Sequence, residues 1–315
     1  MDKKRVQSNL MLLLTALIWG SAFVAQSVGT EYLGAFTFNA ARSFVAGIAL
    51  LPVIFFSDRA KAGRGEAKPH AEPAGRKALV WGGVACGVVL TVAAALQQLG
   101  IAHTTVGKSG FITALYIVLV PIIGIFLKKR AHFTVWLSVA LALVGLYFLC
   151  ITEGFSSIQK GDLLMLACAV AYSGHILVID HFSPKVDCLR MSCIQFFVCG
   201  ALSSIVMLIA ETPTWEGIFA ATIPILYTGV LSSGVGYTLQ MIAQKNTQPA
   251  VASLLMSLES VFAVLAGWAL LGQALSGREI LGCALMFAAI LLAQTPDFLA
   301  GRAAHKPAAQ PQKQS

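Results

Sequence analysis

Residues 248–271 read QPAVASLLMSLESVFAVLAGWALL, an apolar run that holds one ionisable side chain, Glu259. A helix needs roughly 20 apolar residues to cross the hydrocarbon core of a bilayer, which is about 30 Å thick. This run therefore predicts a membrane-spanning helix. It also places a carboxyl group close to the middle of that helix.

Nine further apolar runs of similar length predict an all-α membrane protein of ten transmembrane helices. Of the 315 residues, 57% are hydrophobic and only 11% are charged, whereas a soluble domain usually carries about 25% charged residues. This composition excludes an ordinary soluble enzyme. The nine runs are 9–28, 35–56, 77–99, 106–127, 134–151, 162–181, 188–210, 218–242 and 277–295.

The basic residues predict the orientation of these helices. Most of the 22 lysines and arginines fall in segments that lie on one side if both termini are cytoplasmic, as expected for short cytoplasmic loops. These segments include the loop 57–76 and the tail 297–315, which is predicted to be disordered. The net charge of +8 is explained by this bias, so no nucleic-acid partner is predicted. We expect a multi-pass protein of the plasma or inner membrane.

The two halves of the chain resemble each other. LTALIWGSAF at 14–23 aligns with ACAVAYSGHI at 167–176, and the same offset of 153 aligns Phe44–Gly47 with Phe197–Gly200. Two copies of an odd number of spans must insert with opposite orientations, so we expect two inverted five-helix repeats, 1–152 and 153–296. Many secondary transporters are built from inverted repeats, with the substrate site between them.

Five motifs recur in order along residues 9–295. They are LTALIWGSAFVA at 14–25, FTFNAARSFVAG at 36–47, ALYIVLVP at 114–121, LLMSLESVFAVLAGWALLG at 254–272 and ILGCALMFAAILL at 280–292. Together they resemble the EamA-type ten-helix branch of the drug/metabolite transporter superfamily. The resemblance implies a carrier of small metabolites or drugs, often an exporter, driven by an ion or substrate gradient.

Ionisable residues inside the spans are the first candidates for a functional site, because a charge at the centre of a span costs about 2.5–3.5 kcal/mol. Glu259 is suited to accept a proton or to bind a cationic group, and Arg42 to bind a carboxylate. The structural alternative is an ion pair between the two. His175 is suited to relay protons, or it bonds to a neighbouring hydroxyl group.

Uncharged polar residues recur at helical spacing in four spans. They are predicted either to line a cavity for a polar solute or to bond between helices. The candidates for the solute or coupling-ion site are Trp19 and Gln26, Asn39 beside Arg42, Tyr116, the stripe Ser233, Tyr237 and Gln240, and Ser257.

No cofactor or metal is predicted, because the cysteines lack metal-binding spacing. The Gly-Lys-Ser at 107–109 follows Gly100 at the wrong distance for a phosphate-binding loop. The predicted function is a secondary transporter that works by alternating access. A channel or passive facilitator and a polytopic membrane enzyme are the alternatives. The predicted partners are a small-molecule substrate, the lipid bilayer and protons or another coupling ion, for a monomer or a homodimer.

Overall fold

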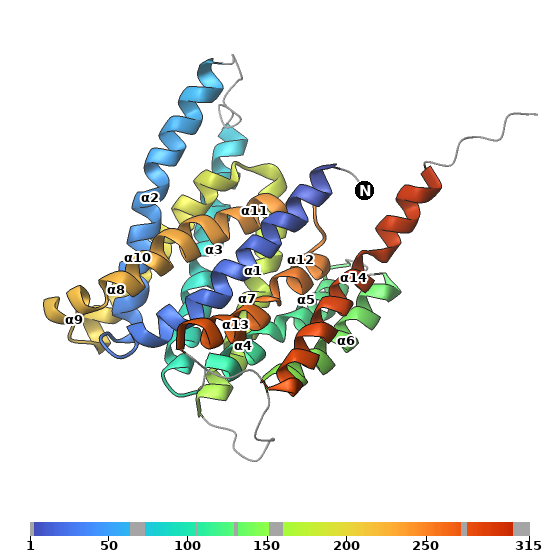
Figure 1. Ribbon diagram of the computed structural model, residues 1–315. Coiled ribbons are helices and arrows are strands. Elements are labelled where there is room, and N and C mark those ends of the chain that lie inside the picture. Colours follow the sequence, from blue (N-terminus) through green and yellow to red (C-terminus); the bar gives the residue numbers. More distant parts are fainter. Residues whose placement is uncertain are drawn as a thin grey trace, which may run out of the picture.

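The computed structural model describes residues 3–63, 73–104, 106–128, 132–150, 160–271 and 276–304, and these residues contain helices and no strands. The prediction of an all-α protein is confirmed. Figure 1 shows the bundle, whose elements are α1 (Lys3–Gly29), α2 (Ala35–Gly63), α3 (Pro73–Ile101), α4 (Val106–Ala114), α5 (Tyr116–Phe126), α6 (Phe133–Cys150), α7 (Lys160–Phe182), the 3₁₀ turn η1 (Ser183–Lys185), α8 (Cys188–Ala210), α9 (Trp215–Ala220), α10 (Thr222–Leu226), the π-helix η2 (Tyr227–Tyr237), α11 (Thr238–Gln244), α12 (Pro249–Met256), α13 (Glu259–Leu271) and α14 (Gly277–Ala304).

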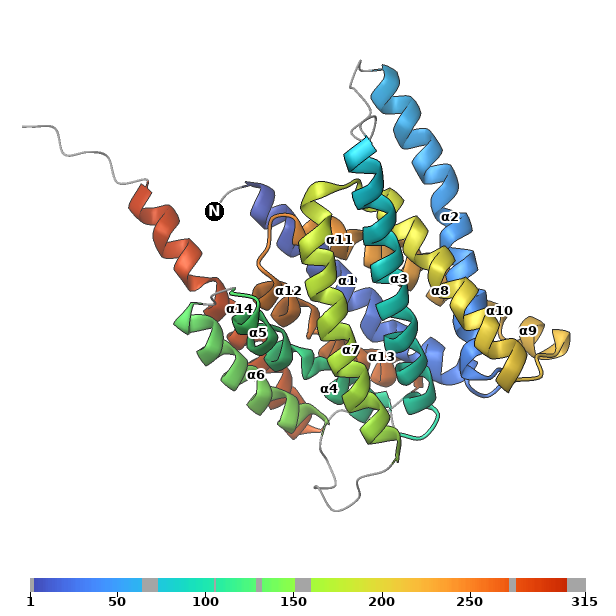
Figure 2. The ribbon, with the colours of Figure 1, turned by 180° about the vertical axis from the view of Figure 1, so that it is seen from behind.

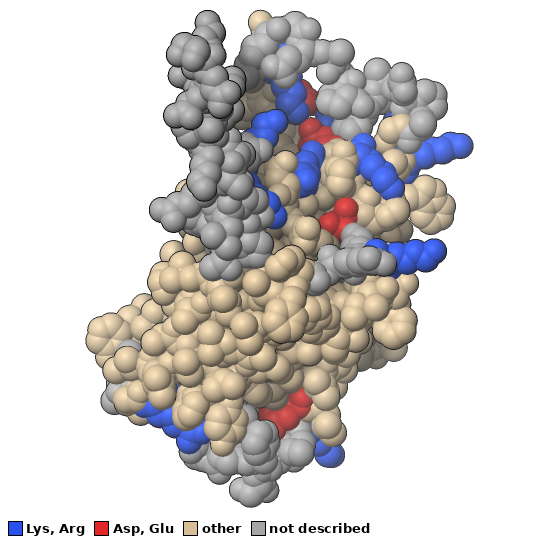
Figure 3. Space-filling view, turned by 90° about the vertical axis from the view of Figure 1, so that its right-hand side faces the viewer, with Lys and Arg blue, Asp and Glu red and all other residues tan. Residues whose placement is uncertain are grey.

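The helices have the length and composition of membrane spans. Within the described residues, seven helical stretches are long and apolar enough to cross a bilayer, and two shorter apolar stretches cover Phe133–Phe148 and Ile280–Ala293. On the face shown in Figure 3, a broad belt free of charged side chains separates charged groups at its two ends. An uncharged belt is what a lipid-facing surface requires.

Three predicted spans are interrupted rather than continuous. The run 106–127 breaks at Leu115, between α4 and α5, and not at Pro121, which lies inside α5. The run 248–271 breaks at Ser257 and Leu258, between α12 and α13. The run 218–242 contains the π-helix η2, whose residues Tyr227–Tyr237 include three glycines. Broken spans are tolerated in membranes where neighbouring helices satisfy the freed backbone groups.

Two segments predicted to be non-helical are partly helical. α2 continues to Gly63 and α3 begins at Pro73, so both helices extend into the predicted loop 57–76. α14 continues to Ala304, which corrects the prediction of a disordered tail for 297–304. Residues 305–315 lie outside the described part. Hydropathy finds the apolar core of a helix, whereas Ala, Lys and Arg extend the helix into water.

The equivalent helices α2 and α8 make reciprocal contacts. Phe44 packs against Gly200, where an added Cβ would lie 3.1 Å from its ring, and Phe197 packs in the same way against Gly47, also at 3.1 Å. The two rings are 6.4 Å apart. Phe44 and Phe197 are equivalent in the two halves, and so are Gly47 and Gly200. Such reciprocal contacts between equivalent residues are the pattern of a twofold-related interface. This pattern agrees with the predicted inverted repeat, whose boundaries at 152 and 296 stay a prediction.

Side chains close both ends of the α2–α8 pair. At the start of α2, Glu211 accepts hydrogen bonds from the backbone amides of Phe36 at 2.9 Å and Thr37 at 2.8 Å. At the start of α8, Asp187 caps the amide of Arg190 and pairs with Lys61 of α2 at 3.0 Å. A carboxylate at a helix N-terminus complements the helix dipole, so each cap fixes one helix against the other.

We expect the cap at Asp187 to make stability depend on pH. Partial burial raises the pKa of Asp187, but the hydrogen bonds from Lys61 and the amide of Arg190 outweigh it and hold the pKa below its usual value. A carboxyl group whose pKa is lower in the folded than in the unfolded protein stabilises the fold at pH values above its unfolded pKa, which is about 3.9 for Asp. This stabilisation is lost as the pH falls through the pKa of the folded protein.

The melting temperature of wild type should therefore exceed that of Asp187→Asn by a constant amount from pH 8 to pH 5, and the difference should shrink below about pH 4. Glu216→Gln on exposed α9 is the control. A difference that stays the same down to pH 2.5 would contradict the assignment.

The remaining spans surround α2 and α8 and complete the bundle. α3 packs on α7 and α8, and α1 packs on α13 and η2. α6 and α14 pack on each other along one edge of the molecule, where Figures 1 and 2 both place them side by side. The interior contacts between α1, α3, α7, η2 and α13 enclose the polar cavity described next.

Candidate functional site

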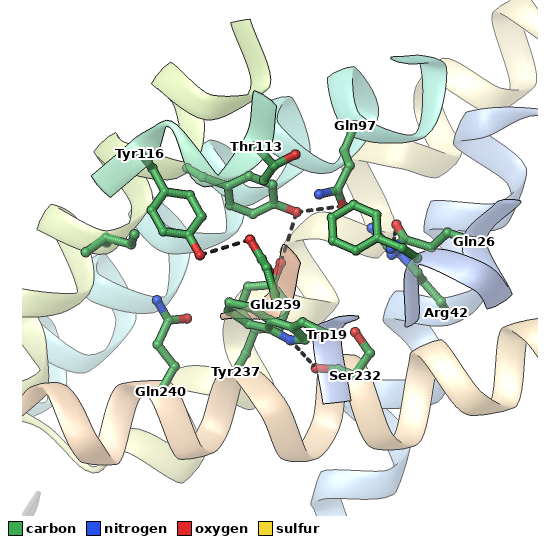
Figure 4. A pocket seen from close by; sticks show the side chains of 13 residues that line it. Trp19, Gln26, Arg42, Gln97, Thr113, Tyr116, Ser232, Tyr237, Gln240 and Glu259 are labelled. Atoms are coloured by element: carbon green, nitrogen blue, oxygen red, sulfur yellow. Dashed lines mark hydrogen bonds between the residues drawn. The ribbon is translucent and has the colours of Figure 1, made fainter. Parts of the chain in front are cut away.

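A polar cavity lies between helices from both halves of the chain (Figure 4). Its volume of about 30 Å³ has room for about two water molecules, so the structure represents a narrow, nearly closed form of the site. The wall consists of thirteen residues, namely Trp19, Phe23, Gln26, Arg42, Gln97, Thr113, Tyr116, Tyr172, Ile176, Ser232, Tyr237, Gln240 and Glu259.

Glu259 enters the cavity from the break between α12 and α13, where it is the first residue of α13 and is 3% exposed. Its Oε1 accepts a hydrogen bond from the hydroxyl group of Tyr116 at 2.9 Å. Tyr116 is itself the first residue of α5, directly after the break in the other half. Tyr116 and Glu259 are 143 residues apart, and the predicted runs that hold them, 106–127 and 248–271, begin 142 residues apart. The two broken helices thus meet at equivalent positions.

Arg42 lies at another side of the cavity, next to Gln26 (Figure 4). Its Nη1 donates to Gln26 Oε1 at 3.0 Å, and its guanidinium lies 5.7 Å from the centroid of the Phe38 ring. Among the described residues, no hydrogen bond or ion pair joins Arg42 to Glu259. The structural alternative of an ion pair is therefore wrong, because Gln26 and Phe38 hold Arg42 while Glu259 turns toward Tyr116.

Aromatic side chains form the wall between the two charged groups. The rings of Trp19 and Tyr237 are 4.7 Å apart, and Trp19 Nε1 donates to the Ser232 carbonyl at 3.1 Å. The Tyr237 hydroxyl donates to the Tyr172 hydroxyl at 3.1 Å, which donates to Gln97 Oε1 at 3.2 Å. This network fixes three aromatic rings in the cavity wall.

Seven of the predicted residues line this cavity, and four do not. The seven are Trp19, Gln26, Arg42, Tyr116, Tyr237, Gln240 and Glu259. His175 instead bonds to Gln195 Oε1 at 3.1 Å, and Ser257 to the carbonyl of Leu254 at 2.7 Å. Asn39 is fully buried on α2, with neither polar atom of its amide bonded to a described residue.

The π-helix η2 explains why Ser233 is replaced by Ser232 in the cavity wall. The predicted stripe Ser233, Tyr237 and Gln240 assumed the spacing of an α-helix. In a π-helix the hydrogen bonds run from i to i+5, so the turn is wider and the side-chain register of an α-helix does not hold. Ser232 and Tyr237 both line the cavity.

The repeat points to several wall residues that the sequence interpretation missed. The offset of 153 relates Tyr172 to Trp19 and Ile176 to Phe23. Gln97 and Gln240 are separated by 143 residues, as are Tyr116 and Glu259. Applying the repeat to the candidates Trp19 and Gln240 would have found Tyr172 and Gln97, whereas Ile176 follows only from Phe23, which was not a candidate. Phe23 and Thr113 lie about one helical turn from the candidates Trp19 and Tyr116.

Within the described residues, no group of three or more His, Cys, Asp or Glu side chains could hold a metal ion. The cavity offers one carboxyl group, one guanidinium, amides, hydroxyls and aromatic faces. Groups of these kinds can bind and orient a polar solute. The wall contains no Ser–His or Cys–His pair of the kind that nucleophilic catalysis uses.

Comparisons with known proteins indicate a membrane transporter. The model of the EamA-like transporter family matches residues 7–151 and again residues 159–295. The chain is 30% identical to an uncharacterized transporter of Archaeoglobus fulgidus over 293 residues, which cover 92% of this chain and 86% of that one. It is 24% identical to a probable terminal-alkyne amino-acid exporter of Streptantibioticus cattleyicolor, covering 89% and 91% of the two chains.

A more distant relative and a solved structure extend the comparison. An uncharacterized inner membrane transporter of Escherichia coli is 23% identical, with 90% of this chain and 89% of that chain covered. A crystal structure aligns with a TM-score of 0.73 at 19% identity, covering 94% of this chain and 98% of that one. At that identity the structural match supports the fold alone.

Proposed function

Because this chain belongs to the EamA-like transporter family, we propose that it is a secondary transporter for small zwitterionic solutes of the amino-acid type. As a member of this family it is a membrane transporter and not an enzyme. The proposal concerns the substrate and the mechanism. Glu259 binds the ammonium group, Arg42 binds the carboxylate, and the aromatic wall receives the side chain of the solute.

The proposal rests on two opposite charges that share one buried cavity without pairing. Arg42 is 6% exposed and Glu259 is 3% exposed. An unpaired charge inside a span costs free energy, and a buried charge gains most from a partner with good hydrogen-bond geometry. A zwitterion brings one charge of each sign and compensates both residues, whereas a simple anion or cation compensates only one.

Two further observations support this class of solute. The faces of Trp19 and Tyr237 suit an apolar or cationic group, and Gln240 and Thr113 supply hydrogen-bonding groups beside them. One relative of similar length is named a probable amino-acid exporter. We carry that name over only as support for the solute class, and the direction of transport is left to experiment.

For the mechanism, we propose alternating access between the repeats 1–152 and 153–296. The cavity lies between the two halves, as expected for a carrier built from inverted repeats. When the solute leaves, Glu259 loses its ionic partner, and protonation would remove the uncompensated charge. A proton is therefore the proposed coupling ion.

Counterflow in proteoliposomes tests this function. Vesicles preloaded with an unlabelled amino acid should accumulate the same labelled amino acid, and the matching amine and carboxylic acid should support less counterflow. A carrier shows this trans-stimulation, whereas a channel does not. Equal accumulation with and without preloading would contradict the carrier mechanism, and a preference for the amine or the acid would contradict the zwitterion.

We also propose that both termini are cytoplasmic. On the face shown in Figure 3, most of the lysine and arginine side chains that the structure describes lie at one end of the bundle, as the positive-inside rule requires of a cytoplasmic side. Reporter fusions or cysteine labelling should place 57–76, 182–187 and 297–315 in the cytoplasm, and 152–161 and 211–217 outside. A reporter that is active outside when fused after residue 300 would contradict this topology.

A further inference from the structure

A second cavity, separate from the first, opens at the end of the bundle where α11 meets α12. Its volume is about 510 Å³, and it is lined by α5, by the end of α7 and by the connection 244–250. We call this cavity the vestibule. Val120 in its wall is one helical turn from Tyr116 of the central cavity. Gln244 in its wall donates to the carbonyl of Ile176 in the central wall at 3.2 Å. The vestibule thus adjoins the central cavity.

One side of the vestibule carries positive charge. α12 begins at Pro249 after Gln248, which makes no side-chain cap, and Pro249 and Ala250 line the vestibule. The first amides of a helix lack intrahelical partners and favour an anion. Lys245 lines the same cavity, and its ammonium group donates to the carbonyl of Val186 at 3.1 Å and also interacts with the Cys188 thiol. An ammonium group has three donors, so one remains for a ligand.

Two buried side chains in this wall have polar atoms without a partner. Thr247 is 3% exposed, and its hydroxyl makes no hydrogen bond to a described residue. Gln244 is 2% exposed, and its carbonyl oxygen is unbonded in the same sense. Leaving buried polar atoms unpaired costs free energy. Because both residues line the vestibule, a polar ligand there would complete their hydrogen bonding.

We propose that the vestibule is a second solute site, which binds the carboxylate end of a small monocarboxylate or zwitterion as it passes between the central cavity and this end of the bundle. The role of this site in transport rests on the proposed function. The binding of a carboxylate there is argued from the vestibule residues alone. The start of α12, Lys245 and the Thr247 hydroxyl bind the carboxylate. Gln244 accepts an N–H of the solute, and Asp180 in the same wall disfavours a second negative charge.

Protection of a cysteine in the vestibule tests the site without requiring transport. Asn246 is exposed and lines the vestibule, so Asn246→Cys in the full-length purified protein is the reporter. Its reaction with N-ethylmaleimide is followed at constant ionic strength in chloride, acetate, glycine or methylammonium. Acetate and glycine should slow the reaction relative to chloride, and methylammonium should not. The wild-type chain corrects for its own cysteines.

Variants in the Asn246→Cys background identify the binding groups. Lys245→Gln should raise the acetate concentration needed for half-protection about fivefold, and Thr247→Val, which keeps the shape, by a similar factor. Lys185→Gln is the matched control, because Lys185 lies on η1 and is not part of the vestibule wall. Melting temperatures confirm that each variant is folded.

Equal protection of the cysteine by chloride and acetate would overturn the site. So would an equal loss of acetate protection in Lys185→Gln and Lys245→Gln, because either result indicates diffuse surface charge. Glu259→Gln should leave protection unchanged. If counterflow fails for every amino acid while acetate still protects, the proposed central function fails alone. If counterflow persists without protection, the vestibule site fails alone.

Discussion

Glu259→Gln is expected to lower counterflow by at least about tenfold while the protein stays folded. A hydrogen bond to a charged group is worth about 1.5–3 kcal/mol, and 1.4 kcal/mol corresponds to a factor of ten in binding. The amide is close in shape to the carboxyl group and can still accept from Tyr116. It does not attract an ammonium group or carry a proton. Uptake and melting temperature of the same preparation measure both effects.

Arg42→Gln and the double variant complete this experiment. Because Arg42 bonds to Gln26 and not to Glu259, the effects of the two substitutions on melting temperature should be additive. Tyr116→Phe removes the hydroxyl but keeps both charges, so it should reduce transport less than Glu259→Gln. A stable Glu259→Gln protein with normal uptake would exclude Glu259 from solute binding. A low melting temperature rescued by Arg42→Gln would indicate a structural ion pair instead.

Gly20→Ala is expected to lower both stability and transport, because α1 and α13 touch at this residue. An added Cβ would lie 2.6 Å from the carbonyl oxygen of Glu259 and 2.8 Å from the backbone nitrogen of Ala263. Backbone atoms cannot rotate away as a side chain can, so the helices must separate. Overpacking of this kind costs about 1–3 kcal/mol, and here it displaces Glu259 directly. Thermal unfolding and counterflow measure the two losses.

Gly174→Ala on α7 is the matched control for this prediction. Gly174 is also inside a helix, but the nearest atom to an added Cβ is Val89 Cγ1 at 3.9 Å, an ordinary contact. Alanine favours a helix over glycine by about 1 kcal/mol, so this variant should be as stable as wild type or more stable. Equal losses in Gly20→Ala and Gly174→Ala would show that close packing is not the cause.

The sequence was sufficient for the fold because membrane spans are decided by apolar length. Each of the ten predicted runs corresponds to one helix or to consecutive helices, and the resemblance to the drug/metabolite transporter superfamily is confirmed by the family match. The breaks at Leu115 and Ser257 could not be predicted. Neither position has the proline or glycine that normally marks an interruption, and tertiary contacts decide them.

The candidate site was only partly predictable, for two physical reasons. Glu259 stands out in the sequence because a charge inside a span costs free energy. Trp19 stands out because its indole N–H needs a hydrogen-bond partner when it is buried. Whether Arg42 pairs with Glu259 depends on side-chain directions across three helices, which spacing alone does not give. Ser232 lines the cavity where Ser233 was predicted. The prediction used the 3.6 residues per turn of an α-helix, whereas this segment is a π-helix.

The short pair α6–α14 along one edge has a consequence for the surrounding lipid. The apolar run of α14 between Glu279 and Gln294 has 14 residues, and α6, Phe133–Cys150, has 18. At 1.5 Å per residue they span roughly 21 and 27 Å, less than the hydrocarbon thickness of about 30 Å. Hydrophobic mismatch of this sign thins the adjacent bilayer at a modest energetic cost. Transport in proteoliposomes should therefore be faster in lipids with shorter acyl chains, and an optimum in long-chain lipids would contradict this.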